Sequence, residues 1–381
     1  MIRYLKWIRQ LNDQPTMRPI NRRTFLHRSA LSSMSLLLPM ACTSRPKGNR
    51  NANKIGVALL GLGSYAGGQL APALQMTRHC HLAGIVTGTP AKIPQWQRKY
   101  GIPDEHVYTY DTMADIANDD AIDVIYVVTP TGTHARFAIA AANTGKHVWC
   151  EKPMAMNVAE CKSMIDACRK NKVNMTIGYR MQHEPNTRTL MSYADNPPFG
   201  PITRVDAQAG YAGGGGTGWR FEKDMGGGAL YDMGVYTVNG IRYTTNRYPT
   251  RVLSARQYTN RPQLFEEVDE TTEYVLEFAD GLKAYGKTSV GENMNILKAT
   301  CAEGWYQLSP MQSYSGVRGE RSDGVQLNQT VRDQQARQMD DDALALLEGR
   351  NFMIPPEEGL QDIRIIEAIM ASAASGEPVT I

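Results

Sequence analysis

The stretch Lys54-Ile55-Gly56-Val57-Ala58-Leu59-Leu60-Gly61-Leu62-Gly63-Ser64-Tyr65-Ala66 decides the fold of this chain. A short apolar run changes abruptly into a turn with Gly61 and Gly63, and a small residue, Ala66, follows three places later. This spacing predicts a strand, a tight turn and a helix in the arrangement that binds a dinucleotide. In that arrangement Gly61 permits the turn, Gly63 lets the backbone approach the pyrophosphate, and the helix N-terminus faces the phosphates.

The following residues supply the rest of the unit that such a turn requires. Residues 69–75 continue as a helix and residues 81–86 form a second apolar strand. Strands and helices keep alternating beyond this unit, with strands expected at 121–128, 146–150 and 173–178 and a helix at 158–171. Such alternation predicts a parallel sheet with helices on both faces, that is, a Rossmann domain at residues 54–178.

Beyond residue 178 the pattern changes. Apolar or alternating stretches without intervening helices follow at 202–211, 252–258, 272–278, 283–290 and 296–302. They predict an open, mainly antiparallel sheet, hence a second domain of α+β type at residues 179–355 that binds substrate and mediates oligomerisation. The exposed face of that sheet is expected to be apolar and to pair with another copy, giving a homodimer or homotetramer. Apolar residues at helical spacing predict a final helix within residues 356–381.

The N-terminal segment is expected to be a targeting signal rather than part of the fold. Residues 1–42 contain the twin-arginine pattern Asn21-Arg22-Arg23-Thr24-Phe25-Leu26, which a weakly hydrophobic stretch follows. We therefore expect export to the periplasm by the twin-arginine machinery, with residues 43–53 as a linker or arm. Lipid attachment at Cys42 and a true start at Met17 both stay open.

The composition excludes several classes of protein. The 381 residues, 42% of them apolar, are enough for two domains, and a net charge of +3 is too small to suggest nucleic-acid binding. The sequence has no run of 18 apolar residues, so nothing is expected to span a membrane in the mature chain. The six cysteines form no Cys-x-x-Cys pair, which favours buried free thiols. His79 and His81 lack a third ligand, so no metal site is expected.

The segment after the second strand bears on the choice of cofactor. In NAD enzymes a carboxylate near this point binds the ribose 2′-hydroxyl. This chain has no acidic residue between Lys54 and Pro103, and it offers the hydroxyl of Thr87 and the ammonium of Lys92 instead. These groups suit a 2′-phosphate and predict NADP, with NAD less favoured. The alternative is a polar turn that contacts nothing.

Three motifs, in this order and spacing, carry a resemblance to a known family. They are Gly61-Leu62-Gly63, Glu151-Lys152-Pro153 and Gly226-Gly227-Gly228 followed by Asp232-Met233-Gly234-Val235-Tyr236. The chain resembles the glucose–fructose oxidoreductase/inositol dehydrogenase family over residues 54–379. Its tyrosine at 236, where most members have histidine, is similar to the glucose–fructose oxidoreductase branch. Further similar segments are Gly178-Tyr179-Arg180, Trp219-Arg220, Asn239-Gly240 with Arg242-Tyr243, and residues 357–362.

The resemblance implies an activity. It implies hydride transfer from C1 of an aldose such as glucose to NADP, giving a lactone, and then reduction of a ketose such as fructose with the same bound cofactor. Internal recycling suits an exported enzyme, which cannot easily exchange NADP. The alternatives are a simple aldose or polyol dehydrogenase, a nicotinamide-assisted glycosidase, and a sugar or nucleotide sensor on the same fold. Sensors tend to lose the lysine that is present here as Lys152.

Hydride transfer from a carbon that bears a hydroxyl needs a group to take the proton and a charge to stabilise the alkoxide. Lys152, at the end of a buried strand, is the candidate for the charge. Tyr236 is the candidate base, because a neighbouring ammonium makes a phenolate easier to form; the alternative is a half-buried core tyrosine. Asp232, four residues earlier on the same helix face, would accept hydrogen bonds from the sugar or orient Lys152.

The full set of expected site residues follows from the motifs and the resemblance together. The cofactor is expected to contact Gly61, Leu62, Gly63, Ser64, Tyr65, Ala66, Thr87, Lys92, Thr129, Thr131, His134, Glu151 and Lys152. The sugar is expected to contact Tyr179, Arg180, Trp219, Arg220, Asp232 and Tyr236. For His134 a structural role at a helix start is the alternative, and for Trp219 an exposed aromatic patch.

Overall fold

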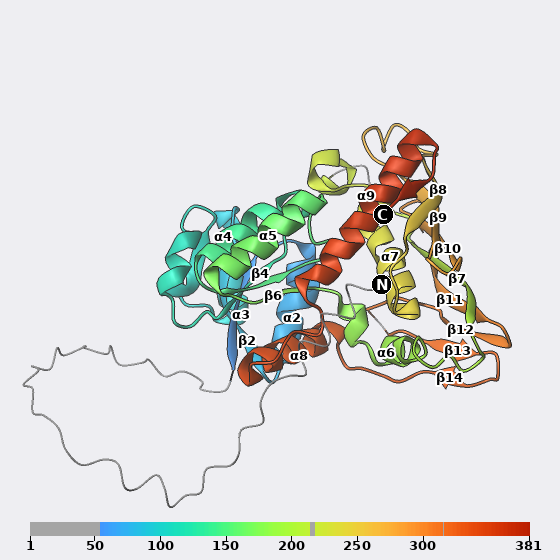
Figure 1. Ribbon diagram of the computed structural model, residues 1–381. Coiled ribbons are helices and arrows are strands. Elements are labelled where there is room, and N and C mark those ends of the chain that lie inside the picture. Colours follow the sequence, from blue (N-terminus) through green and yellow to red (C-terminus); the bar gives the residue numbers. More distant parts are fainter. Residues whose placement is uncertain (1–53, 214–217, 315) are drawn as a thin grey trace, which may run out of the picture. The chain divides into compact units, whose positions relative to one another are not determined.

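The structure is a computed structural model that describes residues 54–213, 218–314 and 316–381 (Figure 1). The predictions on the twin-arginine segment, Cys42 and the linker fall outside the described residues. The described chain is built on a six-stranded and a nine-stranded sheet. None of the helices in these ranges combines the length and apolar character needed to cross a bilayer.

The six-stranded sheet has the order β3-β2-β1-β4-β5-β6 and its strands are parallel. Its strands are β1 (Ile55–Leu60), β2 (Cys80–Thr87), β3 (Val107–Thr109), β4 (Val124–Val127), β5 (His147–Cys150) and β6 (Met175–Ile177). The strand order reverses between β1 and β4, and a doubly wound sheet binds its dinucleotide at this switch point. The predicted Rossmann fold is confirmed.

Side chains of the central strands point alternately into two hydrophobic cores, because successive residues of a strand face opposite sides. The helices that cover the sheet are α2 (Ala71–Leu74), α3 (Ile93–Tyr100), α4 (His134–Asn143) and α5 (Val158–Asn171). On β1, Ala58 and Leu60 join the core that contains α4 and α5. Val57 and Leu59 join the core that contains α2 and α3. Both faces are therefore buried, as the continuous apolar runs of the sequence indicate.

The nine-stranded sheet has the order β14-β13-β12-β11-β7-β10-β9-β8-β15. Its strands are β7 (Ile202–Gly210), β8 (Arg251–Tyr258), β9 (Thr271–Glu277), β10 (Lys283–Ser289), β11 (Met294–Cys301), β12 (Gly304–Leu308), β13 (Gly319–Arg321), β14 (Gln326–Leu327) and β15 (Val379–Thr380). Neighbouring strands are antiparallel, except that β7 and β10 are parallel. The prediction of a mainly antiparallel second sheet is confirmed.

The second half of the described chain also contains α-helices. They are α6 (Pro185–Ser192), α7 (Val235–Thr245), α8 (Gln334–Glu348) and α9 (Pro356–Ser375), and α7 contradicts the expectation of strands without intervening helices. Both α7 and α9 pack on the nine-stranded sheet, and α9 also packs on α5 and β6 (Figure 1). Ala336, Met339 and Ala343 of α8 belong to the core around β1, so this helix packs with the Rossmann domain.

The outer face of the nine-stranded sheet carries charged side chains. Arg204 and Asp206 on β7 form two hydrogen bonds with each other. The Arg204 guanidinium lies 3.6 Å from the centroid of the Tyr285 ring, and Lys287 on β10 pairs with Glu273 on β9. The prediction of a bare apolar face is therefore wrong, because polar residues alternate with inward-facing apolar ones along these strands.

The cysteines of the described chain are buried free thiols, namely Cys80, Cys150, Cys161, Cys168 and Cys301. Burial raises the pKa of Cys80, Cys161 and Cys168 to about 12. These thiols are therefore protonated and unreactive at neutral pH, as expected for core residues.

Candidate active site

A cleft of about 690 Å³ lies at the carboxyl ends of the parallel strands. The turn after β1, the end of β2, the loop after β4 and the segment after β5 form one side of it. Residues of the second domain, among them Asp232, Tyr236 and Tyr314, form the other side. The cleft thus combines the switch point of the sheet with a second wall, which is where a dinucleotide and its substrate meet in such folds.

Most of the predicted site residues line this cleft. They are Gly61, Leu62, Gly63, Ser64, Tyr65, Thr87, Lys92, Thr129, Thr131, Glu151, Lys152, Trp219, Arg220, Asp232 and Tyr236. The predicted residues that do not line it are Ala66, His134, Tyr179 and Arg180. Lining residues that were not predicted as site residues are Thr89, Tyr110, Val128, Pro130, Pro153, Tyr211, Met233, Gln312 and Tyr314.

The turn after β1 has the geometry that a pyrophosphate needs. Gly61 has φ +100°, and a Cβ there would lie 2.6 Å from the carbonyl oxygen of Val128, so a side chain cannot be accommodated. A Cβ on Gly63 would meet nothing within 4 Å, which leaves this part of the backbone open to the cleft. Helical residues begin at Ser64 and continue through the π-helical turn η1 (Ala66–Leu70), whose first residue is buried against the sheet. The cradle fits a dinucleotide.

The end of β2 presents a hydroxyl and an ammonium. Lys92 Nζ donates to the carbonyl oxygen of Leu62 at 2.8 Å, which holds it over the glycine turn. Thr87 is buried and its Oγ1 accepts a hydrogen bond from a backbone N–H two residues further on. Of the described residues that line the cleft, the acidic ones are Glu151 and Asp232, which belong to other walls. This corner therefore suits the 2′-phosphate that distinguishes NADP from NAD.

His134 and Tyr179 lie behind the cleft wall rather than in it. The two ring nitrogens of His134 are each 2.8 Å from a carbonyl oxygen, that of Pro153 and that of Thr129. The ring therefore joins the loop after β4 to the end of the Glu-Lys-Pro segment, and burial lowers the pKa of His134. Tyr179 is buried with its hydroxyl near Asp362, and burial raises its pKa.

Lys152, on the Rossmann side of the cleft, meets Asp232 and Tyr236 of the opposite side. Lys152 Nζ donates to the backbone carbonyl oxygen of Asp232 at 3.1 Å and lies 4.6 Å from the centroid of the Tyr236 ring. The carboxylate of Asp232 accepts hydrogen bonds from Arg220 Nε and the Tyr211 hydroxyl, both at 3.0 Å. Asp232 thus orients Lys152 through its backbone, and its side chain orders the arginine that faces the cleft.

Asp232 and Tyr236 do not share one regular α-helix. Asp232 lies in a π-helical turn, η9 (Leu230–Gly234), and Tyr236 lies in the first turn of α7. Such π turns are frequent at functional sites. Both side chains still line the cleft, so the expected proximity holds although the turn between them is wider than predicted.

Glu151 supports the backbone of its neighbour. One oxygen accepts a hydrogen bond from the Tyr126 hydroxyl at 2.7 Å, and the other accepts one from the backbone N–H of Lys152 at 3.2 Å. A Cβ on Gly178 would lie 2.7 Å from the first oxygen, so glycine is needed for this packing. Burial raises the pKa of Glu151. The carboxyl group therefore fixes the position from which the Lys152 side chain reaches the cleft.

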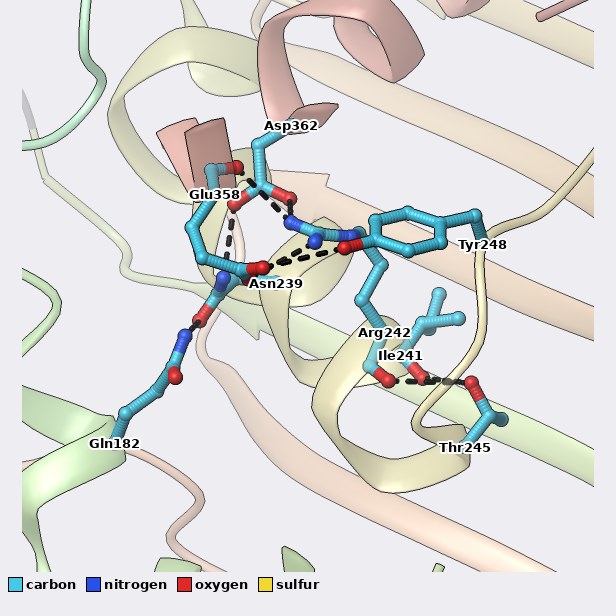
Figure 2. Close-up of polar contacts among 8 residues, drawn as sticks. All are labelled: Gln182, Asn239, Ile241, Arg242, Thr245, Tyr248, Glu358 and Asp362. Atoms are coloured by element: carbon cyan, nitrogen blue, oxygen red, sulfur yellow. Dashed lines mark hydrogen bonds and ion pairs between the residues drawn. The ribbon is translucent and has the colours of Figure 1, made fainter. Parts of the chain in front are cut away.

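A buried polar network holds α7, whose first turn carries the candidate base, against α9 (Figure 2). Arg242 on α7 forms ion pairs with Asp362 and Glu358 on α9. Asn239 donates to Asp362 at 2.9 Å and accepts a hydrogen bond from Gln182 at 3.1 Å. Burial opposes the charge of Arg242, but the two carboxylates raise its pKa overall. Because α9 also packs on the Rossmann domain, the network ties the base to both halves of the site.

Comparison with known proteins identifies the family. Residues 55–179 match a model described as an oxidoreductase family with an NAD-binding Rossmann fold, and residues 187–306 match the GFO/IDH/MocA C-terminal domain. The structure of aldose–aldose oxidoreductase from Caulobacter crescentus is 33% identical with a TM-score of 0.82, and the match covers 86% of this chain and 100% of that one. The chain belongs to the GFO/IDH/MocA family. It is therefore an NAD(P)-dependent oxidoreductase, and the predicted resemblance is confirmed.

Two further relatives are similar to this chain over different lengths. D-xylose 1-dehydrogenase (NADP(+)) 2 from Haloferax volcanii is 24% identical, over 85% of this chain and 98% of that protein. D-xylose 1-dehydrogenase [NADP(+)] from Haloarcula marismortui is 27% identical, over 52% of this chain, and the match spans 57% of that enzyme's length.

Proposed function

We propose that this member of the GFO/IDH/MocA family is an NADP-dependent sugar oxidoreductase that oxidises an aldose such as glucose at C1 to a lactone. The observation that carries the proposal is the convergence of Lys152, Asp232 and Tyr236 in one cleft with a dinucleotide cradle. The names of the relatives support it, since two are NADP-dependent xylose dehydrogenases and one is an aldose–aldose oxidoreductase.

The residues of the cleft have distinct parts in this reaction. Bound NADP supplies the acceptor for the hydride that leaves C1. Tyr236 takes the proton of the C1 hydroxyl as the C–H bond breaks, and Lys152 stabilises the negative charge that develops on that oxygen. Arg220 hydrogen-bonds other sugar hydroxyls, and Trp219, whose ring lies 4.5 Å from the Arg220 guanidinium, offers a face to a pyranose ring.

We also propose that the same bound cofactor reduces a second sugar. The reduced cofactor would supply the hydride for that reaction, and Tyr236 would return its proton to the carbonyl oxygen of the acceptor. The acceptor is a second aldose, as the name of the Caulobacter relative suggests for that enzyme, or a ketose such as fructose. A simple aldose dehydrogenase, which releases NADPH in every turnover, is the alternative that the names of the xylose dehydrogenases favour.

Reaction of the purified protein with single sugars tests this function. An aldose alone should reduce the cofactor, with an absorbance rise at the reduced-nicotinamide band, and a second sugar should reoxidise it without added cofactor. A steady rise that depends on free NADP and is insensitive to a second sugar would favour the simple dehydrogenase. No reduction by any aldose would contradict both.

Lys92→Ala should separate the two cofactors. Loss of its charge is expected to weaken NADP binding by about ten- to a hundredfold, because a charge-assisted contact to phosphate contributes about 1.5–3 kcal/mol. NAD lacks the 2′-phosphate, so its affinity should change by less than about twofold by the same reasoning. Titration of both cofactors by protein fluorescence measures this; equal losses for NAD and NADP would contradict the assignment.

We further propose that the chain is exported to the periplasm by the twin-arginine machinery. The support is the Arg22-Arg23 pair with its flanking pattern. Replacing both arginines by lysine should leave folded precursor in the cytoplasm, as fractionation and the mass of the N-terminus would show. Unchanged export of that variant would contradict the proposal, and a lipid on Cys42 in the exported form would add an anchor.

We propose that two or four copies assemble through the outer face of the nine-stranded sheet. Its charges alternate in sign, with Arg204 beside Asp206 and Lys287 beside Glu273, which suits a self-complementary interface related by a two-fold axis. Light scattering at micromolar concentration should report a dimer or tetramer, and Arg204→Glu should dissociate it. A monomeric wild type would contradict the proposal.

A further inference from the structure

Arg180 is a buried cation that touches the walls of the cleft from behind. It begins the 3₁₀ turn η6 (Arg180–His183), which follows β6, and only 2% of its surface is exposed. None of the ion pairs among the described residues includes Arg180. A buried guanidinium without a carboxylate partner is costly, so its contacts indicate what it does.

The guanidinium joins three segments by hydrogen bonds. Nη2 donates to the side-chain oxygen of Gln312 at 3.1 Å, and Nη1 donates to the side-chain oxygen of Gln334 and, at 3.4 Å, to the carbonyl oxygen of Ser313. Gln312 lines the cleft and Gln334 is the first residue of α8. One side chain therefore links the turn after β6, a wall of the second domain and a helix that packs on the Rossmann core.

The same guanidinium lies against two tyrosine rings of the site. Its central carbon is 5.7 Å from the centroid of Tyr236 and 4.6 Å from that of Tyr314. Lys152 Nζ is 4.6 Å from the Tyr236 centroid, so two cations flank the candidate base. The other titratable groups that interact with Tyr236 or Tyr314 include Tyr65, Glu151, Asp232 and Arg220.

We propose that Arg180 is a positioning residue for hydride transfer, which fixes the Tyr236 ring and the wall formed by Gln312 and Tyr314. This inference rests on the proposed function. The planar fork of arginine suits the task, because it can bond two amide oxygens while its face stacks on aromatic rings. Its positive charge lies beside the Tyr236 ring and is little screened by solvent, because Arg180 itself is buried.

A double-mutant cycle tests the inference. Arg180→Met should slow single-turnover reduction of the cofactor by about ten- to a hundredfold, since small misplacements of reacting groups have effects of this size. In the Tyr236→Phe background the same change should have an effect of less than about threefold, because the group through which Arg180 acts is already lost. Arg180→Lys, which keeps the charge and one hydrogen bond, should recover part of the rate. Equal losses in both backgrounds would overturn the inference.

A second readout does not depend on activity. Amide hydrogen exchange in residues 309–314 should be faster in Arg180→Met than in the wild type, whereas NADP affinity should be unchanged. Gln334→Ala removes one hydrogen-bond partner of Arg180 and leaves the charge of Arg180 in place. If Arg180→Met does not fold, the exchange experiment is done with Gln334→Ala. Unchanged exchange would overturn the inference even if the enzyme oxidises sugars. Absence of sugar oxidation in the wild type would instead overturn the proposed function. In that case, faster exchange in Arg180→Met would still show that Arg180 holds residues 309–314 in place.

Discussion

Tyr236→Phe is expected to slow reduction of the bound cofactor by an aldose about 10²–10⁴-fold, the usual contribution of a positioned acid–base group. The change removes one oxygen and leaves a ring of the same shape between Lys152 and Arg180. NADP and sugar should therefore bind nearly as tightly as in the wild type. Stopped-flow absorbance at the reduced-nicotinamide band measures the hydride step apart from product release.

Tyr274→Phe is a matched control for that experiment. The Tyr274 hydroxyl lies 2.6 Å from Thr237 Oγ1 on the same helix α7, but Tyr274 does not line the cleft. Removal of the Tyr274 hydroxyl should leave the rate of cofactor reduction within about threefold of the wild-type rate. The lost hydrogen bond contributes only about 1 kcal/mol to stability, and the hydroxyl does not contact the substrate. A Tyr236→Phe enzyme that reduces its cofactor as fast as this control would show that another group is the base.

Arg242→Met is expected to lower the free energy of unfolding by about 3–5 kcal/mol, because breaking a buried ion pair leaves an uncompensated charge. Asp362 is fully buried and Glu358 is partly exposed, so the loss of the partner destabilises mainly the buried Asp362 carboxylate. The double variant Arg242→Met/Asp362→Asn should recover part of the loss, since it removes the orphaned carboxylate. Urea unfolding followed by fluorescence measures both variants.

Arg247→Met provides the comparison for the stability experiment. Arg247 pairs with Asp280 at the surface, where the two side chains are 41% and 55% exposed. Such pairs contribute about 0–1 kcal/mol, so this variant should unfold near the wild-type midpoint. Equal destabilisation by Arg242→Met and Arg247→Met would contradict the role assigned to the buried network.

The nucleotide-binding half of the chain could be predicted well because its signals are local. The glycine turn after residue 60, the continuous apolar run of β4 and the lysine at the end of β5 are each determined by a few neighbouring residues. The absence of acidic residues after β2 likewise needed no knowledge of the fold. These parts of the cleft lie where the sequence places them.

The other wall of the cleft could not be predicted in the same way. Gln312 and Tyr314 follow β12 in a segment with little regular structure, and at the site they contact Arg180 and the ring of Tyr65. Tyr211 directly follows β7, and the sequence gave no signal of its contact with Asp232. These contacts arise from the packing of segments that are distant in the sequence. A local sequence motif therefore does not predict them.

Arg180 illustrates how a correct motif can lead to an incomplete role. Its position after a buried strand, together with the resemblance, predicted a contact with sugar, whereas the structure turns its side chain toward Tyr236, Tyr314 and Gln312.

For the outer face of the second sheet, the secondary structure was predicted correctly but the chemical character of the face was not. The alternation of apolar and polar residues correctly predicted the strands. The outer face, which was expected to be apolar, carries the polar and charged residues of that alternation, and the apolar residues face inward.

Transfer of deuterium from an aldose labelled at C1 tests the central claim most directly. The protein with bound NADP is mixed with the labelled sugar, and the cofactor and the sugar product are analysed by mass spectrometry after one turnover. Our account predicts one deuterium in the reduced cofactor for each lactone formed. Unlabelled cofactor, or a reduced cofactor without lactone, would contradict it.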